Sequence, residues 1–251
     1  MSTNAGIRLH GRAIADDLLP DASEPHETRA NSVLRPIVFG ANDGLVSNLA
    51  LVMGVAGASP EPGVIVLAGV AGLIAGAFSM GVGEYISVQS QRELLDYQIA
   101  FQRKQLRDAP DQERRILARI YGERGFSDAE AERFVEAVFD EPDHAVRLLI
   151  FEEVGLDARS IGSPMAAAIG SFLAFTAGAF VPLLPYLLAA GSPAFVGSLG
   201  LSLVALAMLG VGIARLTRRP IGYGAMRQVL LGGLAAAVTY GVGRLIGVAV
   251  A

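Results

Sequence analysis

Asp43 is the residue of this chain whose type and surroundings most clearly indicate chemistry. It lies inside the apolar run FGANDGLVSNLALVMGVAGA, residues 39–58. A carboxylate at the centre of a membrane helix costs about 2.5–3.5 kcal/mol on insertion scales, so such residues usually serve an ion or proton path. In a short soluble core helix, Asp43 would instead be a capping or turn residue beside Gly44. The pattern of the remaining chain favours the first interpretation.

The charged residues are sparse and segregated along the sequence. Of the 251 residues, 52% are hydrophobic and 18% are charged, whereas soluble domains carry about 25% charged residues. No charged residue occurs from Ser160 to Ala214, and a helix needs only about 20 apolar residues to cross a bilayer. The sequence therefore predicts an all-α integral membrane protein.

Five segments rich in glycine and alanine are long and apolar enough to cross the membrane. Such small residues let membrane helices pack backbone to backbone. The predicted transmembrane helices cover about residues 36–57, 63–82, 162–188, 194–214 and 228–250. Pro182 and Pro185 are expected to kink the third helix or to mark its end.

The basic residues alternate from one connection to the next. They lie before the first span (Arg29, Arg35), between the second and third spans (ten arginines and Lys104) and between the fourth and fifth (Arg215, Arg218, Arg219, Arg227). The loops 58–62 and 189–193 contain none. Because basic residues concentrate on the cytoplasmic side, the N-terminus and the segments 83–160 and 215–227 are predicted to be cytoplasmic. Arg244 is an exception that could reach the outer interface.

The segment 83–160 is polar and has helical periodicity. We expect one helix to continue out of the second span through Gln105, and further helices at about 111–124, 128–139 and 144–154. Ser127 and Glu130 form a capping-box pattern, and Gly125 is placed to end the preceding helix. Such a domain is either a charged helical bundle that is merely soluble or a carboxylate-rich metal-binding domain.

The expected organisation has four parts. Residues 1–35 form a polar cytoplasmic tail, with a short amphipathic helix at about 7–19, and residues 36–82 form transmembrane helices one and two. Residues 83–160 form a helical cytoplasmic insertion, and residues 161–251 form helices three to five. The chain has no cysteine, which excludes disulfides and thiolate metal sites.

Three stretches resemble the vacuolar iron transporter family, and together with the predicted topology the resemblance covers nearly the whole chain. They are FGANDGLVSNLALVMG (39–54), AGAFSMGVGEYISVQSQRE (75–93) and FEEVGLD (151–157). The resemblance implies a homodimer that moves ferrous iron, often with manganese, out of the cytosol in exchange for protons. It places the ion path between the membrane helices of two subunits.

The resemblance also implies that Asp43 and Met80 are the transport-site residues. A carboxylate can alternate between a proton and a cation, and a thioether is a soft ligand that disfavours magnesium and calcium. Glu84, one helical turn after Met80, is expected to line the same inward-facing approach. Two alternatives stay open, because a lone methionine often only packs and Glu84 could be a solvated acid at a helix end.

The insertion departs from the family pattern. The family binds metal there through glutamates on the first two helices and through methionine and glutamate on the last. Here the expected ligand positions hold Gln102, Gln105, Ile116, Leu149 and Ile150. Glu113 and Glu153 survive, and Glu152 and His144 could substitute. Because amides and aliphatic side chains replace carboxylates poorly around a divalent cation, this second site is expected to be weakened, reorganised or absent.

The sequence therefore predicts a proton-coupled exporter of ferrous iron. The alternative is a membrane-bound metal sensor or binding protein without transport activity. An enzyme is not expected, since no P-loop, H-E-x-x-H or Ser/His/Asp motif occurs, and no cofactor is expected beyond the transported metal ion and protons. The expected partners are a second copy of the chain, divalent metal ions and lipid, without nucleic acid. Nineteen arginines against one lysine suggest a bacterial inner membrane.

Overall fold

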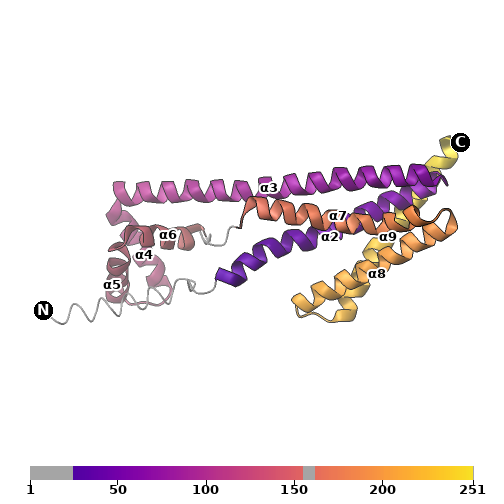
Figure 1. Ribbon diagram of the computed structural model, residues 1–251. Coiled ribbons are helices and arrows are strands. Elements are labelled where there is room, and N and C mark those ends of the chain that lie inside the picture. The colour runs from indigo at the N-terminus through magenta and orange to yellow at the C-terminus, as the bar shows by residue number, and fades with distance from the viewer. Residues whose placement is uncertain (1–24, 155–161, 251) are drawn as a thin grey trace. The chain divides into compact units, whose positions relative to one another are not determined.

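The structure is a computed structural model that describes residues 25–154 and 162–250, with side chains for 34–152 and 162–249. Over these residues the chain forms eight helices and no strand (Figure 1). The helices are α2 (Pro25–Ala58), α3 (Pro62–Asp108), α4 (Pro110–Glu123), α5 (Asp128–Phe139), α6 (Pro142–Val154), α7 (Pro164–Leu188), α8 (Ser192–Leu216) and α9 (Ile221–Val250). The predicted helix at 7–19 lies outside the described residues.

Five of the described helices are long and apolar enough to cross a membrane. These segments are Leu34–Ala58 in α2, Pro62–Asp108 in α3, Pro164–Leu188 in α7, Ser192–Leu216 in α8 and Ile221–Ala249 in α9. The prediction of five long apolar helices in an all-helical membrane protein is confirmed. Helix α7 includes both Pro182 and Pro185 and ends at Leu188, one turn after the second proline.

The prediction of a loop at 215–227 is wrong. Helix α8 continues to Leu216 and α9 begins at Ile221, so Arg215 and Arg227 are helical. The reason is close packing that the charge pattern does not show. A Cβ atom on Gly210 would lie 3.0 Å from the Cα of Ala225, so the first turns of α9 can lie directly on α8.

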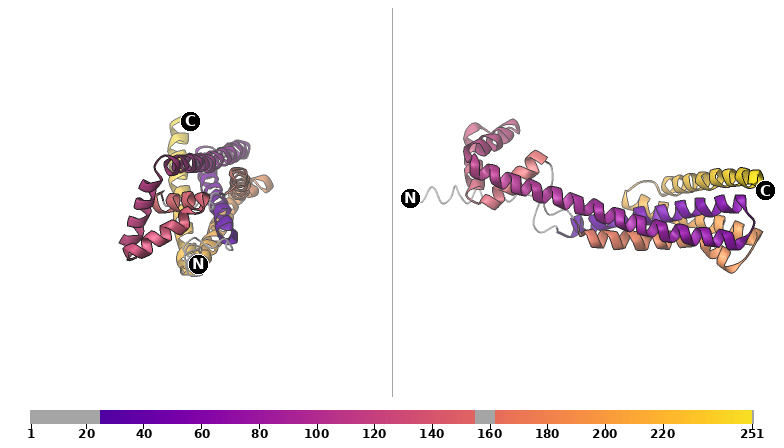
Figure 2. Two further views of the ribbon diagram at one scale, coloured as in Figure 1. Left: turned by 90° about the vertical axis from the view of Figure 1, so that its left-hand side faces the viewer. Right: turned by 90° about the horizontal axis from the view of Figure 1, so that it is seen from above.

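The chain divides into two compact units, and α3 passes from one to the other without a break. Unit 2 consists of Val33–Ser87 and Ser163–Ala251. Within it α2, the first half of α3 and α7 lie side by side, and α8 pairs with α9 (Figures 1 and 2). Glycines bring α2 and α7 together, since a Cβ on Gly40 would lie 2.7 Å from the carbonyl oxygen of Ser171.

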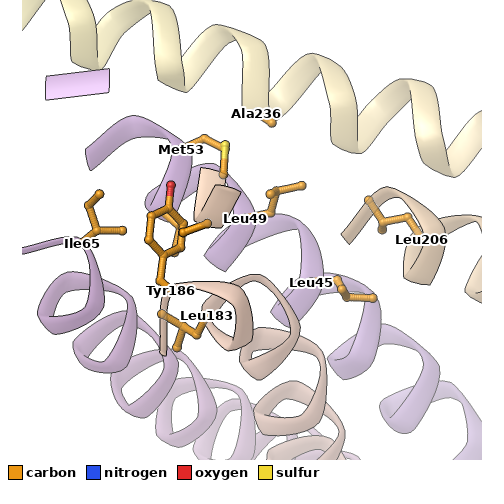
Figure 3. Packing of buried hydrophobic residues seen from close by; sticks show 10 residues of the cluster. Leu45, Leu49, Met53, Ile65, Leu183, Tyr186, Leu206 and Ala236 are labelled. Atoms are coloured by element: carbon orange, nitrogen blue, oxygen red, sulfur yellow. The ribbon is translucent and has the colours of Figure 1, made fainter. Parts of the chain in front are cut away.

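The core of unit 2 is a cluster of aliphatic and aromatic side chains from several helices (Figure 3). Leu49, Met53 and Leu183 are almost completely buried there, and Tyr186 packs beside them. Burial of this kind contributes roughly 1.5–3 kcal/mol per large apolar side chain in water, while close van der Waals packing sustains it within a bilayer. The cluster fixes α2 against α3 and α7, the three helices that form the cavity described below.

Unit 1 contains the C-terminal half of α3 together with α4, α5 and α6. The predicted capping box is present, because the N–H of Ser127 donates to Glu130 Oε2 at 3.0 Å and the Ser127 hydroxyl donates to the same atom at 2.5 Å. These two hydrogen bonds lower the pKa of the Glu130 carboxyl. Gly125 has a φ of +99°, a conformation that glycine adopts readily, and it follows the end of α4 as predicted.

Candidate functional site

A cavity of about 260 Å³ lies within unit 2, between α2, α3 and α7. It is lined by Asp43, Ser47, Asn48, Leu51, Gly72, Gly76, Ser79, Met80 and Phe175. The two residues that the family resemblance placed at the transport site, Asp43 and Met80, thus line one cavity. Ser47 and Ser79 are exposed, so the cavity opens to the surface of the single chain on that side.

Helix α2 supplies the polar wall of the cavity. Asp43, Ser47 and Leu51 recur every four residues, a spacing that places side chains on the same face of a helix. The Ser47 hydroxyl donates to the carbonyl oxygen of Asp43 at 2.5 Å, which satisfies that hydroxyl within the helix. Asp43 is partly buried and is the one ionisable residue in the lining, so it alone gives the cavity a negative charge.

Two glycines on α3 provide the space opposite Asp43. Gly72, Gly76 and Met80 are again four residues apart. A Cβ on Gly76 would collide with the ring of Phe175, and a Cβ on Gly72 would lie 3.1 Å from Asn48 Oδ1. A larger residue at either position would therefore fill the cavity or displace its wall.

Met80 has two kinds of surroundings. It lines the cavity, and it also packs against a small cluster formed by Ala77, Phe175 and Ala179. The packing that the sequence left open as an alternative is thus present, together with access to the cavity. A carboxylate and a thioether in one cavity form a mixed hard and soft donor pair, which suits borderline transition-metal ions better than magnesium or calcium.

Glu84 does not belong to the cavity lining. It is partly exposed and lies one turn after Met80 on α3. The structure thus brings two of the three predicted transport residues together and places the third just beyond them along the helix.

Asn48 is a lining residue that the sequence analysis did not single out. It is 1% exposed, and its side-chain N–H group donates to the carbonyl oxygen of Ala179 on α7 at 2.6 Å. The sequence signal that could have identified it is the one that identified Asp43, namely a polar side chain within an apolar span.

The carboxylates of unit 1 that were candidates for a metal site differ in their burial and in their hydrogen-bond partners. Glu113 is 2% exposed. Arg124 donates to both carboxylate oxygens of Glu152, at 2.7 Å for Oε1, and the Tyr121 hydroxyl donates to Oε1 at 3.1 Å. Burial, followed by the charge of Glu152, raises the pKa of Tyr121, which keeps it a hydrogen-bond donor. Glu153 lies in α6, and its side chain is outside the described residues.

The other positions expected to hold ligands in unit 1 are mostly interior. Leu149 is buried in the core with Leu117 and Tyr121, Ile150 is buried against Leu95, and Gln102 is also buried. Ile116, Gln105 and His144 are partly buried. Over the described residues no group of three or more histidine, cysteine, aspartate or glutamate side chains is arranged to hold a metal ion.

The described part of the chain thus combines five helices that are long and apolar enough to cross a membrane with a cavity among three of them that a carboxylate and a thioether line. The chain belongs to the VIT family, whose family model matches residues 34–244.

Its relatives include a vacuolar iron transporter of Acanthamoeba castellanii, 35% identical over 218 residues that make up 84% of this chain and 78% of the relative. Vacuolar iron transporter 1 of Oryza sativa subsp. japonica is 27% identical over 93% of this chain and 94% of its own. A vacuolar iron transporter of Toxoplasma gondii is 29% identical over 94% and 82%. Membership of a transporter family also agrees with the expectation that the chain is not an enzyme.

Proposed function

We propose that this protein exports ferrous iron, and with it manganese, from the cytosol across the membrane in exchange for protons. The observation that carries the proposal is the cavity in unit 2 that Asp43 and Met80 line together. The names of the relatives, which are iron transporters, support ferrous iron as the cargo.

The chemistry of the exchange rests on Asp43. A carboxylate in a poorly solvated site binds either a proton or a cation, because each neutralises the charge that desolvation disfavours. Arrival of a metal ion then releases the proton, and arrival of a proton releases the metal. Met80 contributes a neutral soft donor, so it favours softer cations without adding a charge of its own.

The cavity of one chain supplies one negative charge for a divalent cation. It is also open at Ser47 and Ser79, so a second copy of the chain could cover that side and contribute its own Asp43. Two carboxylates would neutralise the cation fully. The proposed active form is therefore a homodimer with the ion path between the subunits.

The proposed orientation follows the distribution of arginine. The N-terminus and residues 83–160 would lie in the cytoplasm, and a bacterial inner membrane is the proposed location.

The test is transport by the purified full chain in liposomes that contain a dye sensitive to ferrous iron. With an imposed pH gradient, the wild type should accumulate iron and Asp43→Asn should not, because the amide cannot exchange a proton for a cation. Asp96→Asn, the same chemical change at an exposed carboxylate on α3, is the matched control and should transport normally. Metal binding without uptake by the wild type would instead identify a sensor or binding protein.

A further inference from the structure

Asn48 combines burial with one side-chain atom that remains unused. Its amide nitrogen donates to the Ala179 carbonyl oxygen at 2.6 Å, and this contact fixes which side of the amide carries the nitrogen, since the reverse orientation would place two acceptors together. Within the described part of the chain, no group donates a hydrogen bond to the buried Oδ1. Buried polar atoms are normally paired, so an unpaired oxygen on a residue that lines the cavity is free to accept from a ligand.

The position of Oδ1 along the cavity can be read from α3. A Cβ on Gly72 would lie 3.1 Å from Oδ1, so Asn48 faces α3 at Gly72. Met80 follows Gly72 by eight residues, which is about 12 Å along a helix at about 1.5 Å per residue. Asn48 and Met80 therefore mark opposite ends of the cavity, and Asp43 lies about 7.5 Å from Asn48 along α2 by the same rise.

The backbone positions of the three residues are thus spread over about 12 Å of helix, from the level of Asn48 to that of Met80. Metal–ligand distances are only about 2.0–2.3 Å, so two ligand atoms of one ion lie within roughly 4.6 Å of each other. A cation that leaves the Met80 end of the cavity must therefore move past Asp43 before it reaches Asn48.

We propose that Asn48 is a second station on the ion path, where its neutral Oδ1 receives the cation after the Asp43–Met80 end of the cavity. The inference rests on the proposed function. An amide oxygen suits this step because it replaces one water of the ion without adding charge, and passage through a multi-site path requires binding that is weak enough to be reversed. The hydrogen bond to Ala179 holds the oxygen in place.

The experiment measures the KM and maximal rate of ferrous iron uptake into liposomes for two variants at Asn48. Asn48→Asp keeps the shape and an oxygen at the Oδ1 position, but it replaces the N–H donor to Ala179 with a second carboxylate oxygen. The added negative charge should trap the cation. We expect both the KM and the maximal rate to fall by about tenfold relative to wild type, a size typical of changes around a metal site. Both effects should be larger at about pH 8 than at about pH 6, because a protonated acid resembles the amide.

Asn48→Leu removes the oxygen and should lower the maximal rate by at least about tenfold. Its KM should change by less than about twofold, because the Asp43–Met80 end of the cavity stays intact. Ser198→Ala is the structural control, because it also removes a buried hydrogen bond to an α7 carbonyl, from the Ser198 hydroxyl to Pro182 at 2.6 Å, but away from the cavity. If Asn48→Leu does not fold, Asn48→Asp decides alone.

An unchanged or raised KM for Asn48→Asp would overturn the inference, because a purely structural asparagine gives no reason for tighter binding. Uptake by Asn48→Leu at the wild-type rate would overturn it as well. These results leave the proposed function standing if the wild type transports iron. A wild type that transports nothing would overturn the proposed function and, with it, the second station.

Discussion

At the scale of single residues, the cavity discriminates among cations by the kinds of donor atoms it offers. Asp43 supplies charge, which attracts any divalent cation, whereas the thioether of Met80 interacts appreciably only with softer ions. Magnesium also loses its bound water molecules only at a high cost in free energy. The single carboxylate that each chain contributes compensates for little of this cost. Selectivity is therefore expected to depend on Met80 and net affinity on Asp43.

Replacement of Met80 by alanine should reduce uptake of ferrous iron and zinc by roughly tenfold. Any residual movement of magnesium or calcium should change much less, because these ions gain little from sulfur. Uptake of each ion into liposomes measures this. Met208→Ala, a change at an exposed methionine on α8, is the control for loss of a methionine from the bundle. An equal loss for every ion would show that Met80 only packs against Phe175.

The sequence alone was sufficient to single out Asp43 as a candidate, because an acid within an apolar run is expensive, and the structure places it in the lining of the cavity. Met80 required the family resemblance, since one methionine in a glycine-rich span is most often packing. Asn48 could not have been assigned from sequence in the same way. Its importance depends on which atom of the amide points at α7 and which faces α3, and that is decided only when three helices come together.

At the scale of helices, the cavity exists because α2 and α7 approach closely on the face beside it. Gly44 follows Asp43 directly, and a Cβ at this position would lie 2.9 Å from the backbone nitrogen of Ala179. Gly178 on α7 makes the reciprocal close contact with α2, since a Cβ at this position would lie 3.0 Å from the backbone nitrogen of Leu45. Backbone atoms cannot move aside as a flexible side chain can, so these glycines determine how far α7 lies from Asp43.

Gly44→Ala should therefore lower stability by about 1–3 kcal/mol, the usual cost of overpacking. Thermal unfolding of the purified protein in detergent measures the change. Gly241→Ala, at a helical glycine of α9 with open space around it, is the matched control, and it should be neutral or slightly stabilising because alanine favours the helix. Similar melting temperatures for the two variants would contradict the close contact between α2 and α7.

The helices themselves were largely predictable. The start and end of α5 agree with the predicted range 128–139, because its capping box and the preceding Gly125 are strong local signals. The start of α9 was missed by seven residues, because the arginines around it suggested a loop. Arg227 in fact lies over the ring of Tyr223 within the first turns of α9, at 5.8 Å. The contact between these two side chains thus accommodates the charge of Arg227 within α9, although the sequence pattern had placed this arginine in the connection between two helices.

At the scale of the whole molecule, the two units differ in the contacts that stabilise each of them internally. Unit 2 relies on glycine contacts and apolar packing. Unit 1 has an aromatic and aliphatic core around Tyr121, Phe134 and Leu149, and it also contains the ion pair of Arg124 with Glu152. The sequence predicted the helices of unit 1 and the loss of several family ligands. It did not predict that pair, because Arg124 and Glu152 are 28 residues apart and meet only through the fold.

This ion pair strengthens the expectation that unit 1 binds metal weakly. Glu152 would have to leave Arg124 and Tyr121 to become a ligand. Its side chain is only 3% exposed, and taking a buried carboxylate away from its partners is costly. Leu149 and Ile150 offer no donor atoms, and amides such as Gln102 are weaker ligands than carboxylates. Glu113 and Glu153 are then the main remaining carboxylates, which is fewer than a tight divalent site normally uses.

The measurement is calorimetric titration of zinc into the full chain carrying Asp43→Asn, which silences the cavity of unit 2 and leaves unit 1 unchanged. We expect only weak binding, orders of magnitude below that of a complete site, since changes to the surroundings of a ligand alone typically cost about 10–100-fold. Adding Glu113→Ala should then alter little. Arg124→Gln is the informative companion, because it releases Glu152 and should raise the affinity if carboxylate supply is limiting. Low-micromolar or tighter binding that disappears with Glu113→Ala would show that unit 1 retains a metal site built from other ligands.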